Sequence, residues 1–347
     1  MIKILMAVSA AILLFGCSSK NIVKAVSNSN DSKVSLIFET DMGNDIDDAL
    51  ALDMIYKYIE ADKVNLLGIM SNKNNPFSAE FIDIMATWYG HAEIPIGIVR
   101  SGGNNEVHGG YAQAICELKE DGQPLFERSL TDHESLPAAS HLYRELLSQQ
   151  PDHSVVIVSV GFSTNLAQLL DTKADKHSSL SGRKLVAKKV KMLSVMAGGF
   201  EENSGPEYNV VKDIKAAKKV FEEWPTEIVV SPFEVGLKIL YPGASILNDF
   251  NWGMKHPMVE AYKAYQPMPY DRPTWDLTSV MYVVENGWNY NESASGKITV
   301  DDRGYTHFEE DIKGKHIYLN VTEQQAEEIK TYFVDLIKQK PLKYSNE

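Results

Sequence analysis

Residues 38–52 read FETDMGNDIDDALAL, and this stretch together with its flanks predicts the fold. The apolar run from Val34 to Phe38 has the composition of a short buried strand. From Asp47 to Ile59, apolar residues recur at helical spacing, which predicts a helix. The acidic residues between them therefore lie where a strand ends and a helix begins, and Gly43 can make the sharp turn.

The same alternation continues along the chain. Further strands are predicted over 64–70, 94–99, 154–160, 192–196 and 227–230, and further helices over 79–89, 136–149, 214–224, 273–284 and 323–338. This order is typical of an α/β fold that is Rossmann-like, with a mostly parallel central sheet and helices on both faces. No repeat or linker interrupts residues 34–340, so we expect a single domain there. Ligands of such folds bind beyond the carboxyl ends of the strands.

The composition excludes some classes of partner. The 347 residues include 34 Lys and Arg and 47 Asp and Glu, which gives a formal net charge of −13. Nucleic acid is bound through clustered Lys and Arg, so this acidic balance argues against it as a partner. The two cysteines cannot form a disulfide scaffold.

The N-terminus reads MIKILMAVSAAILLFGC over residues 1–17. Lys3 followed by an apolar run is typical of a signal peptide. The apolar run is too short for a comfortable transmembrane helix. The segment resembles a bacterial lipoprotein signal peptide of residues 1–16, which would leave Cys17 lipidated; a plain secretory signal or an anchor helix is the alternative. Residues 17–33 are rich in Ser and Asn and predict a flexible tether. We expect an extracytoplasmic protein, in the periplasm or on the cell surface, held at the membrane by its lipid anchor only.

Four aspartates fall within the eight residues 41–48, namely Asp41, Asp45, Asp47 and Asp48. Two carboxylates 4 Å apart repel by about 4 kcal/mol at an effective dielectric constant of 20. Helix capping together with solvated acids would explain one or two of these aspartates and leaves the others unexplained. A bound cation would offset the repulsion, and oxygen ligands favour Ca²⁺ or Mg²⁺ over Zn²⁺.

The acidic stretch also resembles a known family. It is similar to the D-x-D-P-G-x-D-D-A fingerprint of the inosine–uridine-preferring nucleoside hydrolases, with Glu39 for the first Asp, Met42 for the Pro, and two extra residues before the Asp47–Asp48 pair, as in a divergent branch. Further motifs resemble the family's in the same order: Ser71-Asn72, Val107-His108-Gly109, Gly161-Phe162-Ser163-Thr164-Asn165, Met196-Ala197-Gly198-Gly199, Glu207-Tyr208-Asn209 and Trp275-Asp276. Several motifs in order are a specific signal, and they imply the nucleoside hydrolase fold.

The resemblance implies calcium-dependent hydrolysis of the N-glycosidic bond of ribonucleosides to base and ribose. It implies one Ca²⁺ per chain, held by Asp41, Asp48, the main-chain carbonyl of Thr164, and Asp276. Asp41, or its neighbour Asp47, would be the catalytic base that accepts a proton from the attacking water. No family role transfers to Asp45, which lies in the longer loop and could orient a ligand.

The resemblance also implies residues that bind the substrate. Asn72, Glu207 and Asn209 would hold the ribose hydroxyls. Trp275 stands where nucleoside-cleaving members often have a histidine that protonates the leaving base. An indole cannot transfer a proton to the base at useful rates. It could instead stack on a purine, and such stacking is worth about 1–3 kcal/mol. His108 is a candidate for activating the leaving group or lining the pocket, and equally for a hydrogen-bonded structural histidine.

Other functions stay open at this level. The same fold and metal could serve the hydrolysis of another N-ribosyl compound. A lipid-anchored nucleoside-binding or ribose-binding protein without turnover is the alternative from a different class. A phosphotransferase with an Asp-x-Asp nucleophile would also need a lysine and a threonine at strand ends, and we identify none. Base preference and oligomeric state, a homo-oligomer included, cannot be read from the sequence.

Overall fold

The computed structural model describes residues 33–102 and 109–345. From Lys33 onward the described residues form one compact unit. The predicted signal peptide and lipidated Cys17 lie outside this range, as does His108, and so does all of the predicted tether except Lys33. Among the described residues, no helix combines the length and the apolar character needed to cross a membrane.

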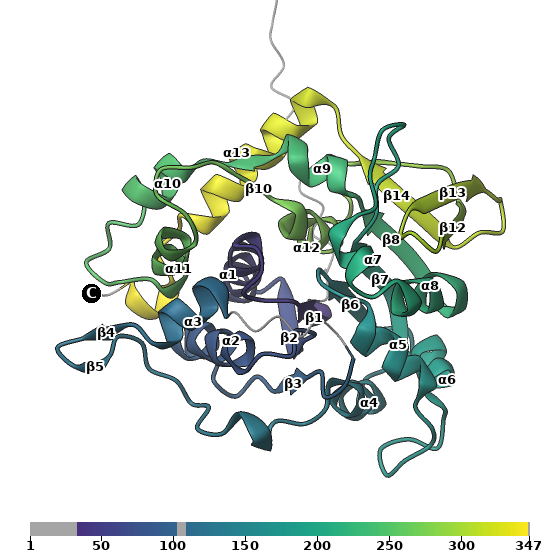
Figure 1. Cartoon of the computed structure of the whole chain (residues 1–347), viewed down its shortest axis with the longest axis horizontal. Helices are drawn as coiled ribbons and strands as arrows, with labels where there is room; N and C mark the ends of the chain where they lie inside the picture. The colour runs from purple at the N-terminus through teal and green to yellow at the C-terminus, as the bar shows by residue number, and fades with distance from the viewer. Residues whose placement is uncertain (1–32, 103–108, 346–347) are drawn as a thin grey trace, which may run out of the picture. The chain divides into compact units, whose positions relative to one another are not determined.

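A mixed sheet with the strand order β13-β12-β14-β8-β7-β6-β1-β2-β3 forms the centre of the unit (Figure 1). The strands that run parallel to one another are β1 (Val34–Thr40), β2 (Val64–Ser71), β3 (Ile96–Ile98), β6 (Val155–Ser159), β7 (Val190–Met196), β8 (Glu227–Ser231) and β14 (His316–Asn320). Antiparallel additions at one end are β11 (Asn291–Glu292), β12 (Gly296–Val300) and β13 (Thr306–Glu310). The predicted mostly parallel sheet is confirmed.

Helices cover both faces of the sheet (Figure 1). One layer contains α1 (Asp47–Glu60), α2 (Pro76–Tyr89), α3 (Gly110–Cys116), α9 (Phe233–Lys238), α10 (Gly243–Asn248), α11 (Pro257–Tyr265), α12 (Trp275–Val284) and α13 (Glu323–Ile337). The other contains α4 (Ala139–Ser148), α5 (Thr164–Asp171), α6 (Gly182–Lys189) and α8 (Ile214–Glu223). Shorter elements are α7 (Tyr208–Lys212) and the strand pairs β4 (Lys119–Glu120) with β5 (Gln123–Pro124) and β9 (Leu240–Tyr241) with β10 (Arg272–Pro273).

The alternation of side chains along β1 explains the two layers. Leu36 and Phe38 belong to the apolar core shared with α1 and α12, whereas Ile37 belongs to the core shared with α4 and α5. Successive side chains of a strand point to opposite faces, so a continuously apolar strand must be covered on both. In agreement with this burial, β1 is an interior strand that pairs with β2 on one side and with β6 on the other. Its carboxyl end therefore lies between the carboxyl ends of these two strands.

Element boundaries differ from the predicted ones by a few residues. Helix α2 begins at Pro76, three residues before the predicted start, because Asn75 accepts a hydrogen bond from the amide of Phe77 and Pro76 occupies the first turn. The helices α3, α5, α6, α9, α10 and α11 were not predicted, since each is short. The same holds for the antiparallel strands β12 and β13.

Candidate active site

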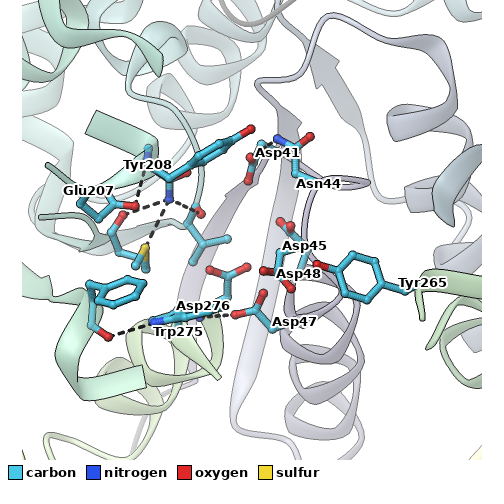
Figure 2. A pocket seen from close by; sticks show the side chains of 14 residues that line it. Asp41, Asn44, Asp45, Asp47, Asp48, Glu207, Tyr208, Tyr265, Trp275 and Asp276 are labelled. Carbon is cyan, nitrogen blue, oxygen red and sulfur yellow. Dashed lines mark hydrogen bonds between the residues drawn. The ribbon is translucent and has the colours of Figure 1, made fainter. Parts of the chain in front are cut away.

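The carboxyl end of β1 leads into an acidic turn at one wall of a pocket (Figure 2). The strand ends at Thr40 and α1 begins at Asp47, so residues 41–46 connect them. The pocket has a volume of about 390 Å³, within the range of small-molecule sites. It lies beyond the strands' carboxyl ends, as the α/β fold predicts.

The pocket wall has an acidic part and a largely apolar part. The acidic part comes from the turn, from the start of α1 and from the start of α12, and Figure 2 shows its carboxylates around a common space. The remaining wall comes from the ends of β6 and β7 and from α7, α9, α11 and α12. The lining residues are Asp41, Asn44, Asp45, Asp47, Asp48, Val160, Met196, Glu207, Tyr208, Asn209, Phe233, Tyr265, Trp275 and Asp276.

Most of the predicted site residues meet in this pocket. Those that line it are Asp41, Asp47, Asp48, Glu207, Asn209, Trp275 and Asp276. Two others, Asn72 and Thr164, are buried and do not line it. Their predicted roles, like those of the lining residues, stay predictions.

The four central aspartates are almost completely buried, with at most 5% of each exposed. Burial raises the pKa of Asp41 to about 6. Burial raises the pKa of Asp47, Asp48 and Asp276 well above the usual range, and repulsion among the neighbouring carboxylates raises it further. Taking carboxylates out of water and placing them together is costly unless positive charge or protons compensate.

Hydrogen bonds fix the direction of these carboxylates. The Thr40 hydroxyl donates to Oδ1 of Asp48, and the Asp276 amide donates to Oδ2 of Asp47 at 3.1 Å. The second bond ties the first turn of α12 to the first turn of α1. Asp276 therefore lies beside Asp47, which is 229 positions earlier in the chain.

The chemistry of this donor set fits a hard divalent cation. Buried carboxylate oxygens with raised pKa values are the ligands that such an ion would favour, because its charge offsets their repulsion. Within the described residues, however, no group of three or more His, Cys, Asp or Glu side chains already has the geometry of a formed metal site.

Glu207 and Asn209 are anchored to the backbone around them. The Glu207 carboxylate caps α7, accepting hydrogen bonds from the amides of Asn209 at 2.8 Å and Val210 at 3.2 Å, and a third from Gly198 at 3.2 Å. Burial raises its pKa to about 7. Asn209 donates to the carbonyl of Val160 at 3.0 Å. Both side chains reach the pocket in a fixed orientation, as a binding role requires.

Asn72 is buried and is not among the residues that line the pocket. Its side chain is fully buried and donates to the carbonyl of Phe162 at 2.8 Å and to Glu39 at 3.3 Å. Glu39 also accepts from Tyr143 at 2.8 Å and Ser159 at 3.1 Å, and burial raises its pKa to about 7. Asn72 thus links the end of β2 to β1 and to the segment after β6.

Thr164 begins α5, and its hydroxyl donates to Asp213 at 2.5 Å. The bond joins α5 to the residue that caps α8, since Asp213 also accepts from the amide of Ala216. The side chain of Thr164 thus has a local structural role. Its carbonyl, the atom proposed as a ligand, stays a prediction.

Trp275 already has partners for its ring. The indole stacks on Phe233 with ring centroids 5.3 Å apart, and Nε1 donates to the Phe233 carbonyl at 2.9 Å. The Arg272 guanidinium also lies over the indole, 5.3 Å from its centroid. A base that stacked on Trp275 would compete with these contacts. Tyr265, which the sequence offered either as part of an aromatic lid or as a residue of a packed loop, lies in the wall, and Tyr208, to which the sequence assigned no role, adds further aromatic surface there.

Asp45 and Arg272 form a bidentate ion pair that the sequence did not reveal. The Arg272 Nε donates to Oδ1 of Asp45 at 2.8 Å, and a second guanidinium nitrogen donates to the other oxygen. Arg272 also lies over the Tyr265 ring, 5.2 Å from its centroid. One guanidinium thereby connects the acidic turn to α11 and to the segment that leads into α12.

This pair should contribute to the stability of the folded protein. The two side chains are only 20% and 28% exposed, and bidentate pairs of this kind are stronger than exposed ones. In a cycle of Asp45→Ala, Arg272→Ala and the double variant, we expect a coupling energy of about 0.5–3 kcal/mol. Urea denaturation of the four proteins measures it, and additive effects would show that the pair is not coupled.

Gly161 packs so closely against Asn72 and the backbone of Asp41 that no side chain fits at this position. A Cβ there would be 2.6 Å from Oδ1 of Asn72 and 2.7 Å from the amide nitrogen of Asp41. We expect Gly161→Ala to destabilise the fold by about 1–3 kcal/mol and to displace Asp41. Thermal denaturation and steady-state kinetics check both effects. Gly205→Ala is the matched control, because a Cβ at Gly205 would have no atom within 4 Å, and an equal effect there would contradict the explanation.

The comparisons with known proteins agree with this fold. Residues 36–335 match the profile of the family described as inosine-uridine preferring nucleoside hydrolase. The fold is that of an N-glycosidase of the nucleoside hydrolase class. The chain belongs to the inosine-uridine preferring nucleoside hydrolase family, whose members use a metal ion.

Solved structures with this fold are distant in sequence. A plant nucleoside hydrolase, PpNRh1, is 17% identical with a TM-score of 0.66, covering 88% of this chain and 97% of its own. A purine-preferring ribonucleoside hydrolase from Gardnerella vaginalis is 18% identical with a TM-score of 0.66, at 88% and 99% coverage. The type III effector XopQ, solved with adenosine diphosphate ribose, is 12% identical with a TM-score of 0.64, at 88% and 94% coverage. No curated protein matches the sequence.

Proposed function

We propose that this protein is a calcium-dependent ribonucleoside hydrolase that acts outside the cytoplasm, anchored through a lipidated Cys17. The observation that carries the proposal is the convergence of Asp41, Asp47, Asp48 and Asp276 in one pocket with Glu207 and Asn209. Carboxylates that are buried together are suited to a cation and to the positive charge that develops on a ribose as its glycosidic bond breaks.

Asp41, Asp48, Asp276 and the Thr164 carbonyl are the residues that would hold the ion. When bound, a divalent cation supplies Lewis acidity that makes water a better nucleophile near neutral pH. The remaining chemistry falls to the side chains. Asp41 is the carboxylate that would accept the proton of the attacking water.

In this mechanism Asp41 accepts the proton of the attacking water as the oxygen bonds to the anomeric carbon. The bond from that carbon to the base nitrogen breaks, and the base departs with its electron pair. Glu207 and Asn209 hold the ribose hydroxyls, which fixes the sugar relative to Asp41. The surrounding carboxylates stabilise the cationic character of the sugar in the transition state.

Ribose release from a panel of nucleosides tests the proposal. The protein is assayed with inosine, adenosine, guanosine, uridine and cytidine, with added Ca²⁺ and with a chelator. Release from at least one nucleoside that depends on Ca²⁺ supports the proposal, and binding without release would favour a binding protein. Incorporation of labelled palmitate into the wild type and its loss in Cys17→Ala tests the anchor.

An N-ribosyl compound other than a common nucleoside is the second candidate substrate. It is favoured by the wall of the pocket, whose described residues include no imidazole and whose Trp275 Nε1 is engaged by Phe233. Leaving groups that depart without protonation would suit such a wall. N-ribosylated pyridinium compounds, whose base departs as a neutral pyridine, therefore belong in the same panel, and faster ribose release from them than from the common nucleosides would favour this candidate.

A further inference from the structure

We propose that Lys73 and Asn44 form a positioning relay that holds the Asp41 carboxylate in its working orientation. The inference rests on the proposed function, in which Asp41 is the base. Relative to the usual family fingerprint, residues 44–46 stand where a single residue is expected, so Asn44 belongs to the longer loop of this chain.

The relay begins at a buried ammonium group. Lys73 comes two residues after the end of β2 and is only 2% exposed. Its Nζ donates a hydrogen bond to Oδ1 of Asn44 at 2.6 Å. A buried ammonium group must donate hydrogen bonds to nearby acceptors, because removing its charge from water is costly.

That contact determines the orientation of the Asn44 amide. An ammonium group can only donate, so the carbonyl oxygen of the amide must face Lys73 and the amide nitrogen must face away. The nitrogen, Nδ2, then donates to Oδ2 of Asp41 at 2.5 Å. A reversed amide would set two donors against each other at Lys73 and two acceptors against each other at Asp41.

The backbone between Asp41 and Asn44 is held independently. Gly43 has φ of +107°, and its amide donates to the Tyr111 hydroxyl at 3.0 Å. A Cβ at Gly43 would lie 3.2 Å from the Cβ of Ala112. The loop cannot shift easily, so the relay acts on the Asp41 side chain and not on the course of the chain. With Oδ2 of Asp41 engaged, the direction of Oδ1 is fixed as well.

The variants Asn44→Ala and Lys73→Met remove the two links separately. Each should lower kcat for ribose release by about 10–100-fold, the usual cost of removing a partner that orients a ligand or catalytic group, and should leave KM nearly unchanged. Each should also weaken Ca²⁺ binding, measured by calorimetry, because Asp41 is a proposed ligand. Lys63→Met is the matched control, since Lys63 pairs with Glu285 at the surface and should have neither effect.

The double variant tests whether the two residues act in series. A relay predicts that Lys73→Met causes less loss in Asn44→Ala than in the wild type, because the hydrogen-bonded path from Lys73 to Asp41 passes through Asn44 and only the direct attraction between the Lys73 and Asp41 charges remains. Multiplied losses, or single variants with wild-type kcat and Ca²⁺ affinity, would overturn the relay and leave the proposed function intact. A wild type that neither releases ribose from any substrate nor binds Ca²⁺ would overturn both.

Discussion

Asp48→Asn is expected to abolish ribose release, with kcat/KM reduced by about 10³-fold or more. Asp48 lies in the first turn of α1 with 1% of its surface exposed, and it accepts a hydrogen bond from Thr40. Asparagine keeps the shape and an acceptor for Thr40 but removes the charge that would bind a cation and stabilise a cationic sugar. Loss of one preorganised electrostatic group commonly costs about 10²–10³-fold, and loss of the ion adds to it.

Stability separates this explanation from simple misfolding. Because burial and, after it, the neighbouring carboxylates raise the pKa of Asp48, an uncharged side chain at this position avoids both costs in the absence of metal. The variant without Ca²⁺ should therefore melt at the same temperature as the wild type or higher. Asp152→Asn, at an exposed acid, is the control and should keep full activity. An active Asp48→Asn enzyme, or one that melts much earlier, would contradict the assignment.

How far the sequence predicted this structure depends on the distance between interacting residues. The strand, the turn and the first helix could be predicted because period and composition are local properties of residues 34–59. Asp41, Asp47 and Asp48 could be grouped for the same reason. Asp276, Glu207 and Asn209 joined them only through the family resemblance, since nothing near them in the chain identifies their spatial neighbours.

The contacts that shape the acidic turn were outside the reach of that reasoning. Asn44 and Lys73 are 29 positions apart, and Asp45 and Arg272 are 227 apart. The first pair forms because the parallel strands β1 and β2 end side by side, and the second because β10, which precedes α12, lies against the acidic turn. The burial of Asn72 and its hydrogen bond to the Phe162 carbonyl were likewise not predictable from the family motif, and its role in binding ribose stays a prediction.

The acidic pocket also predicts how calcium and pH act together on stability. In the metal-free protein, burial raises the pKa of Glu39 and Glu207 to about 7 and that of Asp41 to about 6. A group whose pKa is raised on folding contributes stability below its unfolded pKa, near 4, and loses it as the pH rises through the folded value. For each of these groups, the rise in pKa corresponds to about 3 kcal/mol of stability lost at high pH. The metal-free protein should therefore lose stability steadily between pH 4 and pH 8.

Calcium should offset that loss and be most effective at the upper end. Metal ligands must be deprotonated, so Ca²⁺ binding strengthens over the same pH range in which the metal-free fold weakens. For a domain of this size about 1 kcal/mol corresponds to roughly 2 °C in Tm, and we expect the rise in Tm caused by Ca²⁺ to be at least about 5 °C larger at pH 8 than at pH 5. Differential scanning calorimetry at fixed ionic strength, with and without chelator, measures this difference in Tm.

The Asp48→Asn/Asp276→Asn variant is the control and should show almost no response to Ca²⁺, because two of the proposed ligands lack their charge. An equal response at both pH values, or a metal-free protein that is more stable at pH 8, would contradict a cation site built from these buried carboxylates.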